Sequence, residues 1–187
     1  MAESALRKAV YDDLYSLPDG MIGEIIDGEL IATPRPSRGH VHTTSTLGHE
    51  LGPPYQRGRG GPGGWLIYDD PEIHFGENVL VPDLAGWRKE RLAMPAKDNR
   101  FTISPDWVCE VLSPSTVRVD KVRKMPIYAA HGVPYLWLID PAAKTLDVFE
   151  LGSDSGWVII ASFFEDDRVR AKPFTEIEIE LDALWTE

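Results

Sequence analysis

The sequence predicts an α/β domain in which strands and helices alternate, with added β-hairpins at both ends. Two observations lead to this fold class. Between residues 107 and 140 a helical segment separates two apolar runs of strand type, whereas the residues after Asp140 alternate between short apolar runs and polar turns. The first pattern predicts parallel strands joined by a crossover helix, and the second predicts antiparallel hairpins.

The length of 187 residues fits one domain, residues 1–187, with a sizeable core over about residues 12–185. The chain has one cysteine, which excludes an internal disulfide and a zinc site built from cysteines. It has no window of about 18 apolar residues, and its N-terminus is too polar for a secretory signal. We therefore expect a cytoplasmic protein with no membrane partner.

The formal net charge of −11 argues against a protein whose main function is nonspecific binding of nucleic acid, because such binding needs a basic surface. The charge is unevenly distributed. Of the 30 acidic and 19 basic residues, 12 acidic and 4 basic residues lie from Asp140 onward. The rest of the chain is nearly balanced, so most of the excess acidity need not face a substrate.

The N-terminal residues predict a short helix followed by a hairpin. The helix is expected from Ala5 to Leu14. The hairpin is expected from Ile22 to Thr33, because Asp27-Gly28 lies between two short apolar runs and favours a tight turn.

A first long helix is expected from about His40 to Leu51, with Ser37 as its N-cap and Gly52-Pro53-Pro54 as its end. Residues 52–64 are rich in Gly and Pro, and residues 58–63 match the spacing of a dinucleotide-binding loop. Such a loop should open a helix, whereas a strand follows here, so we reject this interpretation. We expect a mobile loop, in which two arginines are weak candidates for phosphate contacts, namely Arg57 and Arg59.

Three strands are expected next, with an exposed loop to Ser104 before the last of them. They are Trp65 to Phe75, Asn78 to Trp87 and Trp107 to Leu112. The last strand is apolar on both faces and should be central, with Glu110 on one face and Cys109 on the other. Glu110 should therefore be buried, and Cys109 should be an inert core residue.

Two carboxylates end apolar runs of strand type, Asp83 after Val79-Leu80-Val81-Pro82 and Glu110 within residues 106–112. A charge inside such a run must be paired, protonated or bound to a cation, so each residue is a candidate metal ligand. If the two strands are neighbours, the pair can hold a divalent cation. The alternative, a carboxylate paired with an arginine or with backbone donors, stays open on these grounds.

A second long helix should begin at Ser113-Pro114-Ser115-Thr116 and end at His131-Gly132. Within it Asp120, Lys124 and Tyr128 recur every four residues and share a face, while Pro126 should bend the helix. A buried strand and a meander should follow, with strands at Pro134–Asp140, Leu146–Leu151, Trp157–Phe164, Val169–Lys172 and Ile177–Leu181.

Several segments carry a combination of residues that is specific to one protein family. They are Val81-Pro82-Asp83, residues 105–116 (Pro-Asp-Trp-Val-Cys-Glu-Val-Leu-Ser-Pro-Ser-Thr), residues 132–141 (Gly-Val-Pro-Tyr-Leu-Trp-Leu-Ile-Asp-Pro), and Asp120, Lys124 and Tyr128 between them. On these residues the chain resembles the Uma-two family of putative restriction endonucleases. Residues 24–30, Glu-Ile-Ile-Asp-Gly-Glu-Leu, are similar to the N-terminal signature of that family.

The resemblance implies a restriction-endonuclease-like fold of the PD-(D/E)XK type, with a central mixed β-sheet flanked by helices. It also implies a Mg²⁺-dependent, or Mn²⁺-dependent, hydrolysis of phosphodiester bonds in DNA. In that superfamily an Asp and a Glu on adjacent strands bind the metal, and a lysine two positions after the Glu assists hydrolysis. In this chain Leu112 occupies the lysine position. The resemblance instead assigns the role to Lys124 on the following helix.

The residues that match the family pattern are thus expected to have the following roles. Asp83, Glu110 and a carbonyl near Val111 would bind the metal together with water. Lys124 would orient the attacking water or stabilise the anionic transition state. Glu24 would supply a further carboxylate at the edge of the site.

A second hypothesis is a catalytically idle protein of the same fold, which acts as a binding or assembly module. The acidic charge favours it, although a basic cluster on the second helix partly answers this objection: Arg118, Lys121, Arg123 and Lys124. A homodimer is plausible, because restriction-like enzymes often pair to cut two strands. His40 and His42 are expected at a solvated helix end, with an approach to the phosphate or metal as the alternative. Asp69, Asp70 and Glu72 are expected to be solvated, and Tyr128 is expected either to hydrogen-bond into the site or to pack half-buried beside it.

Overall fold

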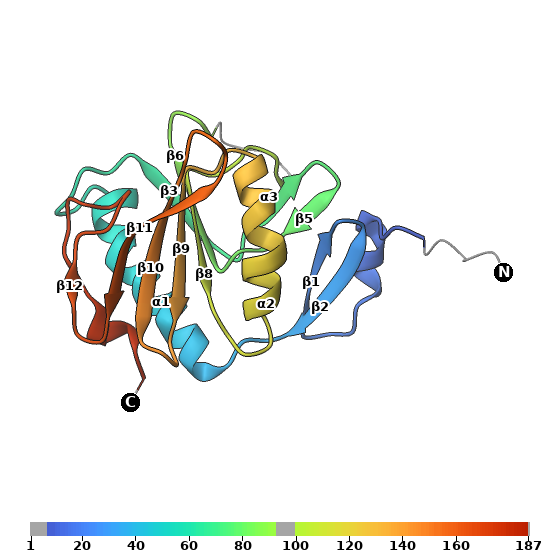
Figure 1. The fold of residues 1–187 in the computed structure, drawn as a ribbon, viewed down its shortest axis with the longest axis horizontal. Helices are drawn as coiled ribbons and strands as arrows, with labels where there is room; N and C mark the ends of the chain where they lie inside the picture. Colours follow the sequence, from blue (N-terminus) through green and yellow to red (C-terminus); the bar gives the residue numbers. More distant parts are fainter. Residues whose placement is uncertain (1–6, 93–99, 187) are drawn as a thin grey trace.

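The computed structural model describes residues 7–92 and 100–186, which form two larger sheets, a small sheet and the helices beside them (Figure 1). The first part contains η1 (Tyr11–Ser16), β1 (Met21–Ile26), β2 (Glu29–Pro34), α1 (Arg38–Leu51) and η2 (Gly52–Gln56). It is followed by β3 (Trp65–Asp69), β4 (Glu72–Phe75), β5 (Asn78–Leu80), β6 (Leu84–Arg88), β7 (Arg100–Phe101) and β8 (Trp107–Val111). The last part contains α2 (Val117–Val119), η3 (Asp120–Lys124), α3 (Met125–Ala130), β9 (Tyr135–Asp140), β10 (Thr145–Leu151), β11 (Trp157–Phe164), β12 (Arg168–Val169), β13 (Ile179–Glu180) and η4 (Leu181–Leu184).

The larger sheet has six strands in the order β11-β10-β9-β8-β6-β3. Strands β8 and β9 are parallel and are joined by the helix α2-η3-α3, whereas all other neighbours are antiparallel. The prediction of a mixed sheet flanked by helices is therefore confirmed. Strand β8 is central, as expected, and all five of its residues are buried.

The two faces of β8 pack into two different cores, because side chains alternate along a strand. Trp107, Cys109 and Val111 lie in one core with Leu47 and Leu51 of α1. The opposite face packs into a second core. This core includes Val108 of β8, Leu112 directly after it, Ile127 and Tyr128 of the crossover helix, and three residues of the other larger sheet, Ile26, Ile73 and Leu80. Helix α1 and the crossover helix therefore cover opposite faces of the six-stranded sheet.

The second sheet has the order β2-β1-β5-β4-β7 and corrects the prediction of two long strands over residues 65–75 and 78–87. Each predicted strand breaks in two, and its halves join different sheets. The first break has Asp70 at a positive φ of 48° followed by Pro71, and the second contains Pro82. A proline has no backbone N–H to donate to a strand ladder, so neither run continues. Asp83 consequently lies directly before β6 rather than at the end of a strand.

The N-terminal segment is partly as predicted. The hairpin of β1 and β2 is confirmed, with Asp27 and Gly28 at positive φ values of 54° and 78°, as a two-residue turn of type I′ requires. The helix predicted from Ala5 to Leu14 is confirmed only from Tyr11 onward, as a short 3-10 helix that runs to Ser16, and residues 7–10 are not helical. It starts at Tyr11 because the Asp13 carboxylate accepts a hydrogen bond from the Val10 backbone N–H at 2.8 Å.

The Gly- and Pro-rich segment after α1 differs from the predicted mobile loop. The chain continues from α1 into the wider turn η2, in which the Tyr55 ring is buried. Backbone N–H groups of Arg59 and Gly63 donate to the carbonyls of Pro53 and Pro54 at 2.8 Å, so the segment folds back on itself. The predicted exposed loop before Ser104 contains the short strand β7, and residues 93–99 of that prediction lie outside the described residues.

The crossover helix contains a wider π-type turn, η3, between its two α-helical ends. Pro126 is the second residue after this turn and has no backbone N–H, so the regular i to i−4 bonding is interrupted there. Asp120 and Lys124 are the first and last residues of η3, and both are buried. The turn therefore carries two charged groups into the interior. Among the described helices, none has the length and apolar content needed to cross a membrane.

Candidate active site

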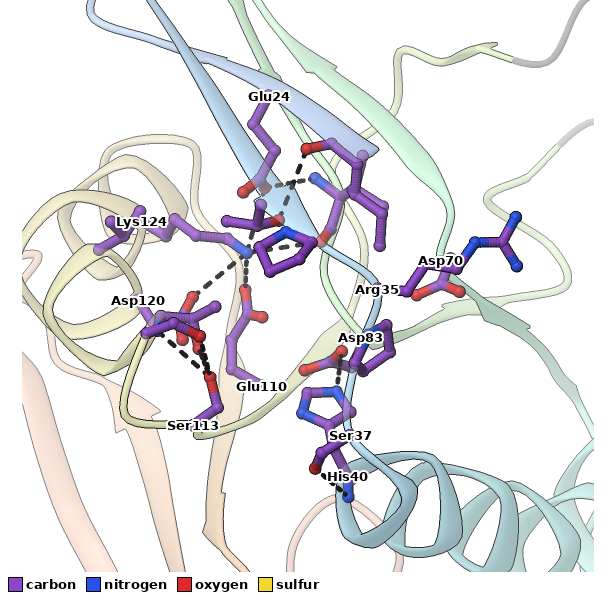
Figure 2. A pocket seen from close by; sticks show the side chains of 18 of the residues that line it. Glu24, Arg35, Ser37, His40, Asp70, Asp83, Glu110, Ser113, Asp120 and Lys124 are labelled. Carbon is purple, nitrogen blue, oxygen red and sulfur yellow. Dashed lines mark hydrogen bonds and ion pairs between the residues drawn. The ribbon is translucent and has the colours of Figure 1, made fainter. Parts of the chain in front are cut away.

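A pocket of about 370 Å³ opens where the hairpin, the start of α1, the segment before β6 and the start of the crossover helix meet (Figure 2). Its charged lining residues come from segments far apart in the chain. They are Glu24, Arg35, His40, Asp70, Asp83, Glu110, Asp120 and Lys124. Four of the five residues predicted for the site, all except Val111, therefore line a single pocket.

Lys124 is the centre of a buried cluster of charges. Its Nζ lies 2.9 Å from Glu110 Oε1, 3.1 Å from Glu24 Oε1 and 3.4 Å from Asp120 Oδ1. We call these four residues the lysine cluster. Each of the four is at most 5% exposed, so the ion pairs are shielded from water and from salt.

Three separate elements bring the lysine cluster together. Glu24 comes from β1 of the hairpin, Glu110 from the centre of β8, and Asp120 and Lys124 from η3. The predicted sharing of a helix face by Asp120, Lys124 and Tyr128 is confirmed, because all three side chains bond within this one group of charges. The Tyr128 hydroxyl donates to Glu110 Oε1 at 2.5 Å in the interior.

Asp83 is held on both of its carboxylate oxygens. Its Oδ1 lies 2.6 Å from Nε2 of His40, and its Oδ2 accepts a hydrogen bond from the Val111 backbone N–H at 2.7 Å. Strands β6 and β8 are antiparallel with Leu84 opposite Cys109, so the next pair along this register is Asp83 and Glu110. The expected neighbourhood of the two carboxylates is thereby explained by the strand register.

Glu24 also has a second partner, the backbone of the segment before Asp83. Its Oε1 accepts a hydrogen bond from the Val81 N–H at 2.8 Å, and Lys124 Nζ donates to the Val81 carbonyl at 3.4 Å. The lysine cluster is therefore bonded to the segment that precedes Asp83. This contact fixes the position of Asp83 relative to Glu110.

Several carboxylates of the pocket are buried close to one another, and this raises their pKa values. Burial raises the pKa of Glu110 well above its usual value, and the charges of Asp120, Asp83 and Glu24 add to the rise against the effect of Lys124. Burial likewise raises the pKa of Asp120 and of Asp70. Ionised carboxylates are thus disfavoured here, and a further cation would favour them.

The two basic groups that contact carboxylates in the pocket are favoured in their charged forms. Burial alone would lower the pKa of Lys124, but the charges of Glu110, Tyr128, Glu24 and Asp120 raise it well above its usual value. Burial would also lower the pKa of His40, but the hydrogen bond and charge of Asp83 outweigh it and raise the pKa. Lys124 is therefore a permanent cation.

His40 is the residue of the pocket that the sequence interpretation undervalued. Ser37 caps α1 and accepts a hydrogen bond from the His40 N–H at 3.3 Å, which places His40 in the first turn and turns its ring toward Asp83. The Ser37 cap was visible in the sequence, but the partner of the ring was not. His42 behaves differently, since its Nε2 lies 3.0 Å from the Ala183 carbonyl, away from the pocket.

Two other expectations about charge need correction. Asp70, expected to be solvated, lines the pocket, because the positive φ at this residue turns the chain there. The predicted basic cluster on the crossover helix does not form a common surface. Lys124 is buried in the lysine cluster, and Arg123 pairs with Glu29 at 2.7 Å and with Asp27 at 3.7 Å on the hairpin turn.

The donor set of the pocket fits a hard divalent cation. In residues 7–92 and 100–186, no three His, Cys, Asp or Glu side chains gather closely enough to hold a metal ion by themselves. Mg²⁺ does not require such a cage, because it is commonly held by one or two carboxylates together with water and substrate phosphates. Asp83 and Glu110 supply two carboxylates at the pocket, and the excess of acidic lining groups favours a cation.

Comparisons with known proteins bear on this fold and pocket. The model of the Uma2 family, described as "putative restriction endonuclease", matches residues 10–183. A crystal structure of a putative nuclease belonging to DUF820, from Anabaena variabilis, superimposes with a TM-score of 0.76 at 24% identity, over 94% of this chain and 97% of that chain. No curated protein matches. The expected family and the restriction-endonuclease-like fold are thereby confirmed.

Proposed function

The chain belongs to the Uma2 family of putative restriction endonucleases, and on that premise we propose that it is a metal-dependent endonuclease that hydrolyses phosphodiester bonds of DNA. One observation carries the proposal. Leu112 stands where the wider superfamily has its lysine, yet an ammonium is supplied from the crossover helix, because Lys124 Nζ lies 2.9 Å from Glu110. The combination of Asp, Glu and Lys is thus complete in space although it is interrupted in sequence.

Asp83, Glu110 and a carbonyl near Val111 are the groups that would hold Mg²⁺ or Mn²⁺. When bound, the cation supplies a water of lowered pKa and neutralises negative charge on the phosphoryl oxygens. His40 and the Val111 N–H fix the orientation of Asp83, and Tyr128 does the same for Glu110. Because these hydrogen bonds already orient the two carboxylates, their side chains lose little conformational freedom when a cation binds, and this favours binding.

Lys124 would act on the attacking water or on the charge of the transition state. Its pKa is raised by the surrounding carboxylates, so it carries a proton at any physiological pH and does not act as a base. A buried ammonium in a low-dielectric site stabilises a developing anion more strongly than one in water. Glu24 and Asp120 hold this ammonium in place, which makes Glu24 a positioning residue rather than a group that touches substrate.

The second candidate function is a catalytically idle binding or assembly module. One observation favours it, namely that the Lys124 ammonium is already satisfied by three carboxylates and is only 3% exposed. In such a protein the lysine cluster would serve the fold alone. An idle module would bind its partner without needing a divalent cation, and its function would survive the loss of Asp83.

Nicking of supercoiled plasmid DNA separates the two candidates. We expect the purified protein to nick plasmid in Mg²⁺ or Mn²⁺ and to lose this activity in EDTA and in Asp83→Asn. Asp147→Asn is the matched control, because Asp147 lies on β10 away from the pocket and its side chain accepts a hydrogen bond from Ser162. Activity that is absent across substrates, or equal in Asp83→Asn, would reject the nuclease. Nicks in both strands at one position would further support a homodimer.

A further inference from the structure

An anionic substrate has to approach a pocket whose lining is mainly acidic. Five lining residues carry carboxylates, Glu24, Asp70, Asp83, Glu110 and Asp120. Each phosphate of a nucleic acid carries a negative charge and would be repelled by them. A nuclease that uses this pocket therefore needs cationic groups free to meet the backbone beside the reacting bond.

Two of the three basic side chains in the lining are not free for this purpose. Lys124 is surrounded by the carboxylates of the lysine cluster and is nearly inaccessible. His40 is 9% exposed and bonded to Asp83 at 2.6 Å. The charge of each is offset by partners within the protein, so neither can serve as the main anchor of an incoming phosphate.

Arg35 is the third basic residue of the lining, and its situation is different. It lies in the short segment between β2 and α1, is exposed, and makes no ion pair with any residue in 7–92 or 100–186. Figure 2 shows its guanidinium pointing away from the lysine cluster. The charge of Arg35 is thus available to solvent and ligands at the rim of the pocket, whose other lining residues are mainly acidic.

The chemistry of this group suits a phosphodiester. A guanidinium presents a planar fork of N–H donors that matches two phosphate oxygens. We propose that Arg35 binds a backbone phosphate of the DNA substrate and so positions the strand over Asp83 and Glu110. The inference rests on the proposed function, since it names the residue that brings the substrate to that same site.

The chain offers a matched control three residues away. Arg38 is also exposed, but it lies on α1 and lines a separate hollow with Val41 and His42. Both substitutions, Arg35→Gln and Arg38→Gln, remove one positive charge, so any effect of net charge on DNA binding is common to the two variants. A difference in DNA affinity between the two variants therefore depends on the position of the lost charge.

Binding of a fluorescein-labelled DNA duplex, measured by anisotropy in Ca²⁺ over a series of salt concentrations, tests the proposal. We expect Arg35→Gln to bind about tenfold more weakly than the parent at low salt. The slope of log affinity against log salt should fall by about one, and Arg38→Gln should change neither value. A thermal melt of each variant checks that both are folded.

The outcomes separate this proposal from the function it rests on. Equal weakening in both variants, or an unchanged salt slope in Arg35→Gln, would overturn the role of Arg35 even if plasmid is nicked. Binding that depends on Arg35 without any metal-dependent nicking would support the phosphate contact and reject the nuclease. A parent protein that binds no DNA at all would overturn the role of Arg35.

Discussion

The Nζ of Lys124 lies 2.9 Å from Oε1 of Glu110, and the two side chains are 3% and 2% exposed. One belongs to the crossover helix and the other to the central strand of the six-stranded sheet. The contact therefore joins two layers of the fold at the floor of the pocket. Removing the ammonium from this pair is costly, because the carboxylates around it stay in the interior without a cation, whereas Lys124 keeps Glu24 and Asp120 as partners when Glu110 loses its charge.

Lys124→Met should destabilise the fold in a pH-dependent way. Removing the ammonium leaves three buried carboxylates unpaired, so we expect the free energy of unfolding at pH 8 to fall by about 3 kcal/mol. At pH 5 the loss should be smaller, since the carboxylates of raised pKa take up protons there. Urea unfolding at the two pH values measures both, and exposed Lys121→Met is the control. An equal loss at both pH values would contradict this description of the cluster.

Glu110→Gln should stabilise the protein at neutral and alkaline pH. Because the fold raises the pKa of Glu110 above its ordinary value of 4.5, the folded protein binds this proton more tightly than the unfolded chain. The corresponding stability is present below pH 4.5 and is lost as the pH rises through the raised value. Glutamine keeps the Tyr128 hydrogen bond without the charge, so the variant should gain about 1 kcal/mol at pH 8 and show a weaker pH dependence.

Urea unfolding between pH 5 and pH 8 checks this prediction. The control is Glu150→Gln on β10, where the carboxylate pairs with Lys172 at 3.2 Å near the surface. A Glu110→Gln protein that is less stable than its parent at pH 8 would show that the charged form of Glu110 stabilises the fold.

Divalent cations should raise the melting temperature of the parent protein. A ligand that binds only the folded state stabilises it in proportion to the logarithm of its concentration over its dissociation constant. We expect Mg²⁺, Mn²⁺ and Ca²⁺ to stabilise the parent and to have no effect on Glu110→Gln. Stabilisation of the same size in that variant would place the cation elsewhere.

His40→Gln should weaken the binding of these cations without removing a metal ligand. The His40 ring orients Asp83 through a contact of 2.6 Å, and loss of such a supporting bond commonly costs about 10-fold to 100-fold in metal affinity. Titration of Mn²⁺ followed by calorimetry measures the change. His42→Gln is the control on the same helix, because His42 contacts Ala183 instead. Equal affinities in the two variants would mean that His40 does not support Asp83.

The sequence predicted the parts of the fold that rest on local patterns. The hairpin at Asp27-Gly28, the Ser37 cap and the two faces of β8 depend on turn preference, capping and side-chain alternation, and the structure bears them out. The two broken strands were missed because a run of apolar residues looks the same whether it stays in one sheet or crosses between two. Only Pro71 and Pro82 marked those breaks.

The residues of the candidate site were likewise predicted only in part from the sequence. Asp83, Glu110 and Lys124 were identified from residue type and from a family resemblance, and helical spacing placed Lys124 with Asp120 and Tyr128. The contact of His40 with Asp83 and the exposure of Arg35 at the rim depend on how α1 and the hairpin pack around the segment before β6. Such contacts join residues distant in sequence, and no local pattern encodes them.

The central claim is that Lys124 supplies from the crossover helix the cation that Leu112 does not supply from the strand. The rate of plasmid nicking by Lys124→Gln in Mg²⁺ tests it most directly, with Lys121→Gln as the control and circular dichroism to show that both variants are folded. We predict that the rate falls by about 100-fold or more in Lys124→Gln and is unchanged in Lys121→Gln. A folded Lys124→Gln protein that nicks DNA at the parental rate would contradict the claim.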